Sequence, residues 1–322
     1  MIGLAETLLQ VRELKVHYYT LSGIVRAVED VDLDVGRGEW VSVVGESGSG
    51  KTTLAFSITR LVPPPGRIVG GSIVFDGLDL ARAPVEKVRE VRGRRIAMIF
   101  QDPGAYLDPL RRVGDQIAEA ILEHRLASSW GEAWRRAQEA LEEVGIPASR
   151  ARFYPHQLSG GQRQRVAIAS AIALEPDLLV ADEPTTALDV VVQARIMEVL
   201  GRLKRRGLSI LMITHDIALA REVSDRIAVM YAGRIVEEGP SESIVREPQH
   251  PYTQALIESL PDPWERKTLK GIPGEPPDLR SPPGGCPFHP RCPLAVDECR
   301  RSWPAVSRRR GGGRLFCHVT GG

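Results

Sequence analysis

The stretch WVSVVGESGSGKTTLAFSITRL, from Trp40 to Leu61, contains the strongest pattern in this sequence of 322 residues. An apolar run, Trp40–Val44, precedes a glycine-rich segment that matches the P-loop pattern, and a helix-compatible segment follows it. This order of strand, loop and helix is the context that the pattern requires. The glycines allow backbone N–H groups to turn inward around phosphate oxygens, in conformations that side chains would obstruct. The sequence therefore predicts an α/β fold with a phosphate-binding loop.

The loop residues are expected to bind a nucleotide together with Mg²⁺. Lys51 supplies positive charge to the β- and γ-phosphates, and Thr52 offers its hydroxyl to Mg²⁺. The N-terminus of the following helix adds its partial positive charge at the same place. The predicted nucleotide-binding residues are Gly45, Glu46, Ser47, Gly48, Ser49, Gly50, Lys51, Thr52 and Thr53.

A second motif supplies carboxylates for the metal. The apolar run Leu178–Ala181 fits a strand buried on both faces, and Asp182 and Glu183 follow it directly. Asp182 is expected to hold Mg²⁺ from the carboxyl end of the strand, where open α/β sheets bind their ligands. Glu183 is expected to orient and polarise the attacking water as a general base.

The wider pattern, from about Leu9 to Val236, alternates short apolar runs with longer amphipathic stretches, which predicts a mainly parallel sheet with helices. Strand signals stop between Asp102 and about Tyr154, where apolar residues recur at helical spacing over 113–123 and 130–144. This predicts a helical insertion. The expected strands are Val28–Val35, Trp40–Val44, Ser72–Phe75, Ile96–Phe100, Leu178–Ala181, Ser209–Ile213 and Ile227–Tyr231.

Composition excludes several classes of protein. Lys and Arg total 42 against 41 Asp and Glu, and the net charge of +1 gives no general attraction for nucleic acid or anionic lipid. The longest apolar stretch, Val166–Leu174, is much shorter than the roughly 20 residues that span a bilayer. The N-terminus lacks the basic segment, apolar run and cleavage site of an export signal, so we expect a cytosolic protein.

The composition changes after Gly239. The final 82 residues hold 13 of the 24 prolines, and proline at this density prevents long helices and central strands. They also contain an Arg-rich stretch at 300–314, with RRRGGGR at 308–314. Contact with partner subunits or lipid headgroups is an alternative for this stretch, but such runs usually face water. The sequence predicts a small irregular module that needs a metal or a partner to hold it. It contains all four cysteines, Cys286, Cys292, Cys299 and Cys317.

The segment LSGGQ at Leu158–Gln162, followed by RQRVAIASAIALEPDLLVADEP, resembles the signature segment of ATP-binding cassette (ABC) ATPases. Its order and spacing relative to the P-loop and the acidic strand also fit that family. Ser159, Gly160 and Gly161 open a helix, which presents a hydroxyl, backbone N–H groups and a positive dipole end to an anion. In the family this segment, here with Gln162, serves the ATP bound on a partner subunit. The resemblance thus implies ATP clamped between two cassettes.

The resemblance also assigns roles to single residues. Gln101 matches the glutamine that senses Mg²⁺ and the attacking water and that links to the transport domain. His215 matches the histidine that contacts the γ-phosphate, and Asp189 matches the loop aspartate that crosses the dimer. Tyr18 or Tyr19 is expected to stack on adenine, with Tyr19 as the assigned residue, although VHYYT also fits ordinary strand composition.

The implied fold is that of an ABC cassette, which is a P-loop NTPase. It has a RecA-like core with a mainly parallel sheet, an antiparallel β subdomain and a helical subdomain, followed here by the small cysteine-containing module. The expected boundaries are 1–101 and 159–240 for the nucleotide-binding core with its N-terminal β subdomain, 102–158 for the inserted helical subdomain and 241–322 for the C-terminal module.

The segment HPYT at 250–253, together with GESGSGKTTLA and QDPGAYLDP, resembles the ATP-binding subunits of oligopeptide and dipeptide importers over nearly the whole chain. The resemblance implies that ATP hydrolysis powers peptide import from the cytoplasmic face of the membrane. The implied partners are a second, different ATPase subunit, two membrane permeases and an extracytoplasmic binding protein, without nucleic acid. Related systems carry oligosaccharides or nickel, which stay as alternatives.

Two further alternatives belong to other classes of ABC protein. A DNA-repair or chromosome ATPase is disfavoured because about 113 residues separate the P-loop from the signature, which leaves no room for a coiled coil or a large DNA-binding insert. A translation-associated cassette protein would carry two cassettes in one chain, whereas one is found.

The four cysteines have the spacing C-x5-C-x6-C-x17-C. Clustered cysteines in a reducing compartment favour a metal site over disulfides, but the C-x2-4-C knuckle of structural zinc sites does not occur here. Four thiolates suit a cubane iron–sulfur cluster, and the related importer subunits look to carry a 4Fe-4S cluster in this segment. We expect this cluster, with zinc and with free or disulfide-linked thiols as alternatives. His289 and His318 are candidate substitute ligands, although each also fits a solvated loop histidine.

Overall fold

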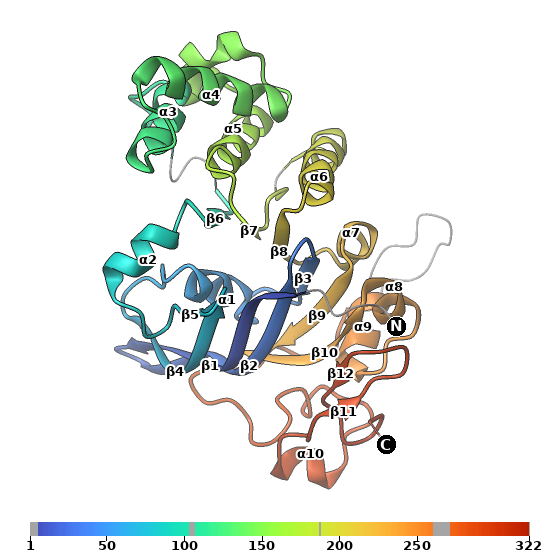
Figure 1. Ribbon diagram of the computed structural model, residues 1–322. Coiled ribbons are helices and arrows are strands. Elements are labelled where there is room, and N and C mark those ends of the chain that lie inside the picture. The colour runs from blue at the N-terminus through green and yellow to red at the C-terminus, as the bar shows by residue number, and fades with distance from the viewer. Residues whose placement is uncertain (1–5, 103–106, 187, 260–270, 322) are drawn as a thin grey trace. The chain divides into compact units, whose positions relative to one another are not determined.

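The computed structural model describes residues 6–102, 107–186, 188–259 and 271–321 (Figure 1). As far as they are described, the residues form two compact units, and each unit is considered by itself. The first unit is drawn from three parts of the chain, Met1–Gly36, Trp40–Arg82 and Ile213–Gly322. The second comprises Arg37–Glu39 and Ala83–Met212.

The first unit contains an antiparallel sheet with the strand order β2-β1-β4-β5. The long strand β1 (Thr7–Thr20) pairs with β2 (Gly23–Gly36) on one side and with β4 (Gly66–Phe75) on the other, and β5 (Leu78–Asp79) pairs with β4. In β1 the side chains of Leu9, Val11, Leu14 and Val16 are fully buried, with a register shift between Val11 and Leu14. This near-alternation is what a strand with one face on the core requires.

A second sheet of this unit carries the strand that leads into the P-loop. β3 (Trp40–Val44) is parallel to β9 (Arg226–Tyr231), and β10 (Arg234–Pro240) is antiparallel to β9. The two-residue strands β12 (Arg314–Leu315) and β11 (Ser307–Arg308) extend the sheet beyond β10. All five residues of β3 are buried, as its apolar run predicts. The end of the chain therefore joins the sheet that positions the P-loop.

Short helices complete the first unit. The longest described helix after Gly239 has eight residues, so the described part of the proline-rich end contains no long helix, as its composition predicts. Among the described helices of the protein, none has both the length and the apolar character needed to cross a bilayer. The helices of this unit are α1 (Lys51–Ile58), α7 (Ile217–Val223), α8 (Ser241–Arg246), α9 (Pro251–Glu258) and α10 (Asp297–Arg301).

The second unit is mainly helical. The helix over 113–123 has the predicted bounds, and the one predicted over 130–144 ends one residue earlier. These two helices pack against each other and against α5, in the green part of Figure 1. The helices of this unit are α2 (Val85–Val91), α3 (Val113–Glu123), α4 (Trp130–Glu143), α5 (Gly160–Ile172), α6 (Val190–Arg205) and the 3-10 turns η2 (Ala148–Arg152) and η3 (Pro155–Gln157).

Two parallel strands of the second unit, β6 (Ile96–Ile99) and β7 (Leu178–Asp182), carry predicted site residues at their carboxyl ends. A further strand, β8 (Ser209–Thr214), crosses the division of the chain into units. All seven predicted strands occur, with bounds that shift by a few residues. The sequence pattern missed β10 and most of β1 because their polar residues interrupt the apolar alternation.

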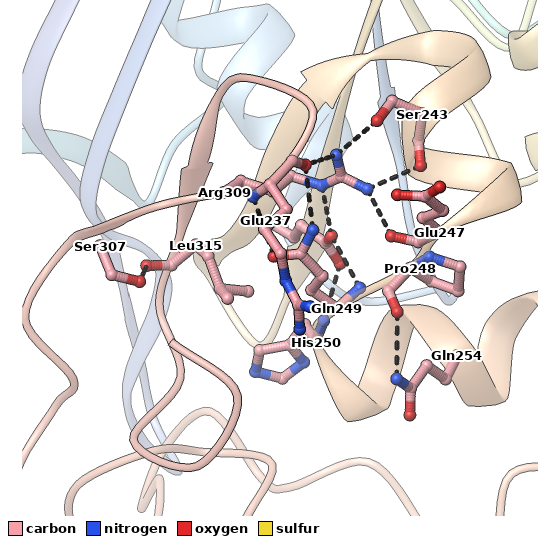
Figure 2. A network of polar contacts seen from close by, with 11 residues as sticks. Glu237, Ser243, Glu247, Pro248, Gln249, His250, Gln254, Ser307, Arg309 and Leu315 are labelled. Atoms are coloured by element: carbon pink, nitrogen blue, oxygen red, sulfur yellow. Dashed lines mark hydrogen bonds and ion pairs between the residues drawn. The ribbon is translucent and has the colours of Figure 1, made fainter. Parts of the chain in front are cut away.

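The basic segment at 308–314 does not lie wholly in water, and the expectation that it does is wrong for Arg309. This residue is 1% exposed, and its Nε donates a hydrogen bond to Oε1 of Glu237 in β10 at 2.7 Å (Figure 2). Its two Nη atoms donate to the hydroxyl and the carbonyl oxygen of Ser243 and to the carbonyl oxygen of Glu247. The neighbours Arg308 and Arg310 are exposed, as expected.

Both oxygens of the Glu237 carboxylate, which faces the Arg309 guanidinium, accept hydrogen bonds. The backbone N–H groups of Gln249 and His250 donate to its two oxygens at 3.0 and 2.9 Å (Figure 2). Burying a charge is tolerated only when it is paired and hydrogen-bonded, and both conditions hold here. The pair therefore fixes the end of the chain to β10 and to the start of α9.

Replacing Arg309 by Met should destabilise the protein by breaking this buried pair. The free energy of unfolding should fall by about 3–5 kcal/mol, because Glu237 would be left as an uncompensated buried charge. Arg308→Met is the matched control and should change it by less than about 0.5 kcal/mol, since Arg308 is exposed. Denaturant titrations of both variants measure the difference, and equal midpoints would contradict a stabilising role for Arg309.

Candidate active site

The P-loop connects β3 to α1 within the first unit, and its glycines are required by close backbone approaches. Gly45 has φ +159° and Gly50 has φ +102°. A Cβ atom at Gly45 would lie 2.1 Å from the backbone oxygen of Met230, and one at Gly50 would lie 2.1 Å from that of Ala27. No side chain fits at either position, so the loop passes these carbonyl groups only as glycine.

Lys51 points back over this loop. It is 5% exposed, and its Nζ donates to the carbonyl oxygens of Gly45 and Glu46, each at 2.8 Å, with the Ser49 hydroxyl at 3.3 Å. Lys51 is also the first residue of α1, so its ammonium and the positive end of the helix dipole lie at the same loop. Both favour the binding of phosphate groups there.

Glu46 is held by two residues from the C-terminal part of the chain, which sequence reasoning missed. Its backbone N–H donates to Oη of Tyr252 at 2.8 Å. Its carboxylate accepts two hydrogen bonds from the guanidinium of Arg291, at 2.8 and 3.2 Å. Burial raises the pKa of Tyr252, so this phenol stays protonated. The HPYT segment marked Tyr252 only as a family resemblance, and nothing in the sequence pointed to Arg291.

The other predicted residues of the first unit lie on β1 and after β8. The Tyr18 hydroxyl is 3.4 Å from the hydroxyl of Thr53 in α1, whereas Tyr19 is 46% exposed, with the Arg67 guanidinium 5.8 Å from its ring centre. Either ring remains a predicted adenine contact. His215 is exposed and directly follows β8.

The second unit brings Gln101 and Glu183 together at the ends of β6 and β7. Asp182 is buried at the end of β7, and Glu183 follows it with φ +45°, a left-handed conformation that is uncommon for residues other than glycine. Oε2 of Glu183 accepts hydrogen bonds from Nε2 of Gln101 at 3.1 Å and from the hydroxyl of Thr186 at 2.7 Å. Two donors on one oxygen fix the orientation of the carboxylate, which suits it to activate a water.

The signature segment forms the capped start of α5. The Ser159 hydroxyl accepts the backbone N–H of Gln162, and the Gln162 side chain accepts the backbone N–H of Ser159. This reciprocal capping box fixes the start of the helix. A Cβ at Gly161 would lie 2.7 Å from Val192 of α6, and Asp189 caps that helix by accepting the N–H of Val192. Gly161 and Asp189 are therefore linked through one valine.

The four predicted cysteines are all free, in the C-terminal part of the first unit. Burial raises the pKa of the Cys286 thiol to about 12, and the thiols of Cys299, Cys317 and Cys292 push it in the same direction. Cys286 and Cys299 lie in one buried side-chain cluster with Cys292 packed against it, and the backbone N–H of Cys286 donates to the carbonyl oxygen of Cys299 at 2.9 Å. In the described part of the chain, no group of three or more His, Cys, Asp or Glu side chains is arranged to hold a metal ion.

The two histidines considered as substitute ligands bind backbone instead. Nδ1 of His289 lies 3.0 Å from the carbonyl oxygen of Cys286, and Nε2 of His318 lies 3.0 Å from that of Ser302. Each ring thus has a partner within the protein.

Comparison with known proteins identifies the family of this chain. A family model described as "ABC transporter" matches residues 28–186, and a model described as "Oligopeptide/dipeptide transporter, C-terminal region" matches residues 236–299. DppD of Escherichia coli, a dipeptide transport ATP-binding protein, is 45% identical over 97% of this chain and 96% of its own length. This chain belongs to the family of ABC transporter ATP-binding proteins.

Other relatives are equally similar. The probable peptide ABC transporter ATP-binding protein y4tR of Sinorhizobium fredii is 46% identical over 97% of this chain and 95% of its own length. OppD of Escherichia coli, an oligopeptide transport ATP-binding protein, is 44% identical over 93% and 90%. The resemblance to the oligopeptide and dipeptide branch of the family is confirmed, and the oligosaccharide, nickel and DNA-repair alternatives are not favoured.

Solved structures show the same cassette fold. The ABC cassette MJ0796, in a dimeric post-hydrolysis state bound to ADP and phosphate, matches with a TM-score of 0.67 and 31% identity, over 72% of this chain and 98% of its own. The protein cbiO1 of Clostridium perfringens matches with a TM-score of 0.64 and 29% identity, over 75% and 92%. The predicted ABC ATPase fold is therefore confirmed, and this ABC-type chain is an ATPase.

Replacing Glu183 by Gln should abolish most ATP turnover while leaving ATP bound. The amide keeps the size of the side chain but cannot take a proton, so hydrolysis should fall by about 100-fold or more. Phosphate release and nucleotide binding are measured on the same preparation. Glu198→Gln, at an exposed glutamate of α6, is the control and should hydrolyse ATP normally. Substantial turnover by the Glu183 variant would remove this residue from the role of general base.

Proposed function

We propose that this chain hydrolyses ATP to power the import of dipeptides or oligopeptides through an ABC transporter. The supporting observation is the match of the C-terminal region, residues 236–299, to the oligopeptide/dipeptide transporter model, beside relatives named as peptide transport proteins at 44–46% identity. The residues that bind and hydrolyse ATP are shared by ABC cassettes in general. The C-terminal region distinguishes the oligopeptide and dipeptide transporters from other ABC transporters. Peptides are therefore the proposed cargo.

The geometry of each unit supports distinct steps of hydrolysis. In the first unit, Lys51 and the start of α1 bind the phosphates, with Thr52 as a ligand of Mg²⁺, the ion that neutralises developing phosphate charge. In the second unit, Asp182 is the proposed second protein ligand of that ion. Glu183 accepts the proton of the attacking water, and Gln101 holds its carboxylate in place through their hydrogen bond.

The proposed active form is a pair of cassettes that clamp ATP between them. In this arrangement Ser159, Gly160 and Gly161 of one cassette face the γ-phosphate bound by the other, and Asp189 crosses the contact. The capped N-terminus of α5 supports this proposal because its orientation is fixed before any partner binds. The similar cassette MJ0796 forms a dimer in its post-hydrolysis state.

The proposed partners are a second, different ATPase subunit, two membrane permeases and an extracytoplasmic substrate-binding protein. The chain would then work on the cytoplasmic face of the membrane, without nucleic acid. ATP binding closes the cassette pair, closure pulls on the permeases, and hydrolysis reopens it. The balanced charge of the chain fits a partner recognised by shape and local contacts.

Uptake of a radiolabelled dipeptide tests the transport function. Cells without this chain should lose uptake, and the unchanged gene should restore it. A gene with Lys51→Ala should not restore uptake, because the loss of the lysine charge weakens ATP binding. Comparable amounts of both proteins in the membrane fraction serve as the control. Uptake that persists without the chain, or that returns with the Lys51 variant, would contradict the proposal.

We further propose that Cys286, Cys292, Cys299 and Cys317 hold a 4Fe-4S cluster, with one zinc ion as the alternative. Four free cysteines support the cluster, because cysteine thiolates hold a cubane and three of the four lie in or against one buried side-chain cluster. The matched C-terminal region includes three of the four cysteines. The group would supply cross-links among these loops.

The metal content distinguishes these alternatives. Protein purified without oxygen should be brown and contain about four irons per chain, as a cubane cluster requires. Cys299→Ser should lower the iron content and the visible absorbance together, whereas Ser307→Ala, in the same region but not at a cysteine, should leave both unchanged. A colourless wild-type protein with one zinc would overturn the cluster.

A further inference from the structure

The P-loop residue Glu46 is held on two sides by residues more than 200 positions further along the chain. Tyr252, the second residue of α9, accepts the backbone N–H of Glu46 at 2.8 Å. Arg291 forms a paired contact with the carboxylate, from Nη1 to Oε2 at 2.8 Å and from Nη2 to Oε1 at 3.2 Å. Such paired arginine–carboxylate contacts fix orientation as well as distance.

Arg291 is itself held rigidly. Its side chain is 4% exposed, its Nε donates to the carbonyl oxygen of Pro273 at 2.8 Å, and Nη2 donates to that of Ile272 at 3.2 Å. Nη1 also lies 3.3 Å from the Tyr231 hydroxyl. A long side chain with this many fixed contacts loses little further freedom when it binds Glu46, so the ion pair is stronger than an exposed one.

Tyr252 is equally constrained. The centre of its ring lies 4.5 Å from that of Tyr231 and 5.4 Å from that of Phe288. Its own backbone N–H donates to Nδ1 of His250. Burial lowers the pKa of His250 to about 3, so this ring stays neutral and keeps its accepting nitrogen. The hydroxyl of Tyr252 is thereby aimed at the P-loop by a packed aromatic core.

Glu46 is the residue through which these constraints reach the nucleotide lysine. Its carbonyl oxygen accepts the ammonium of Lys51 at 2.8 Å and the backbone N–H of Ser49 at 3.2 Å. Fixing the backbone of Glu46 therefore fixes one of the oxygens that position Lys51, together with the turn that follows it.

We propose that Arg291 and Tyr252 are positioning residues for ATP binding, which clamp Glu46 and hold the P-loop in the shape that receives the phosphates. A loop that is already ordered binds its ligand without paying for that ordering, so the clamp contributes to affinity. Once ATP is bound, its phosphates order the loop themselves. Loss of the clamp should therefore raise the KM for ATP and change kcat little.

The test compares KM and kcat for ATP in the assembled transporter, with Arg291→Ala, Arg291→Lys and Tyr252→Phe. Arg291→Ala should raise KM about tenfold or more, as expected for a lost charge-assisted hydrogen bond, with kcat within about twofold. Arg291→Lys keeps the charge but not the paired geometry and should fall between Ala and the wild type. Tyr252→Phe should raise KM by about threefold to tenfold.

A double-mutant cycle separates the clamp from a general loss of structure. Glu46→Ala alone should raise KM as Arg291→Ala does, and the double variant should be no worse than either, because both remove the same contact. Arg280→Ala is the matched control, since Arg280 lies in the same segment but pairs with Asp278. It should leave KM unchanged.

Three outcomes would overturn the proposal. These are an unchanged KM in Arg291→Ala, additive effects of the Glu46 and Arg291 substitutions, or an equal rise in KM with Arg280→Ala. If Arg291→Ala does not fold, the KM values of Arg291→Lys and Glu46→Ala are compared with that of the wild type instead. Turnover by the unchanged protein tests ATP hydrolysis separately. If turnover is absent, the Kd for ATP of the same variants tests the clamp in place of KM.

Discussion

The close passage of the P-loop between two carbonyl groups is the constraint on which the nucleotide site depends. Gly45 runs against the carbonyl group of Met230 and Gly50 against that of Ala27, at separations that exclude any Cβ. Met230 belongs to β9 and Ala27 to β2, so strands of both sheets in the first unit set the path of the loop. The parallel pairing of β3 with β9 then fixes where the loop begins.

From this loop a continuous set of contacts extends to the end of the chain. Glu46 contacts Tyr252 and Arg291, Tyr252 is bound by His250, and the backbone of His250 is bound by Glu237. Glu237 is neutralised in turn by the buried Arg309. The proline-rich end of the chain is irregular in secondary structure, but its polar contacts join it to the P-loop and to β10. The described C-terminal region thus contributes to the first unit through these polar contacts and not through a long helix.

In the second unit, local contacts fix the orientation of the predicted site residues. Glu183 adopts a left-handed backbone conformation and shares one carboxylate oxygen between Gln101 and Thr186. Such strain is retained where surrounding contacts determine it, and it is common at active sites. The start of α5 is fixed by its capping box, and Gly161 leaves room for Val192 of the neighbouring helix. The Glu183 carboxylate and the start of α5 are thus both oriented by contacts within the second unit.

The sequence by itself determined the elements whose signal is local. The P-loop, the buried strand before Asp182, the helices over 113–123 and 130–144 and the cap at Ser159 each depend on residues close together in the chain, where spacing and residue type decide the conformation. Only the tertiary structure decided the partners of Glu46 and the burial of Arg309. Arg291 is 245 positions from Glu46, and Arg309 is 72 positions from Glu237. One arginine in a basic or proline-rich run looks like any other, because pairing across such distances is set by how the chain folds back and not by its neighbours.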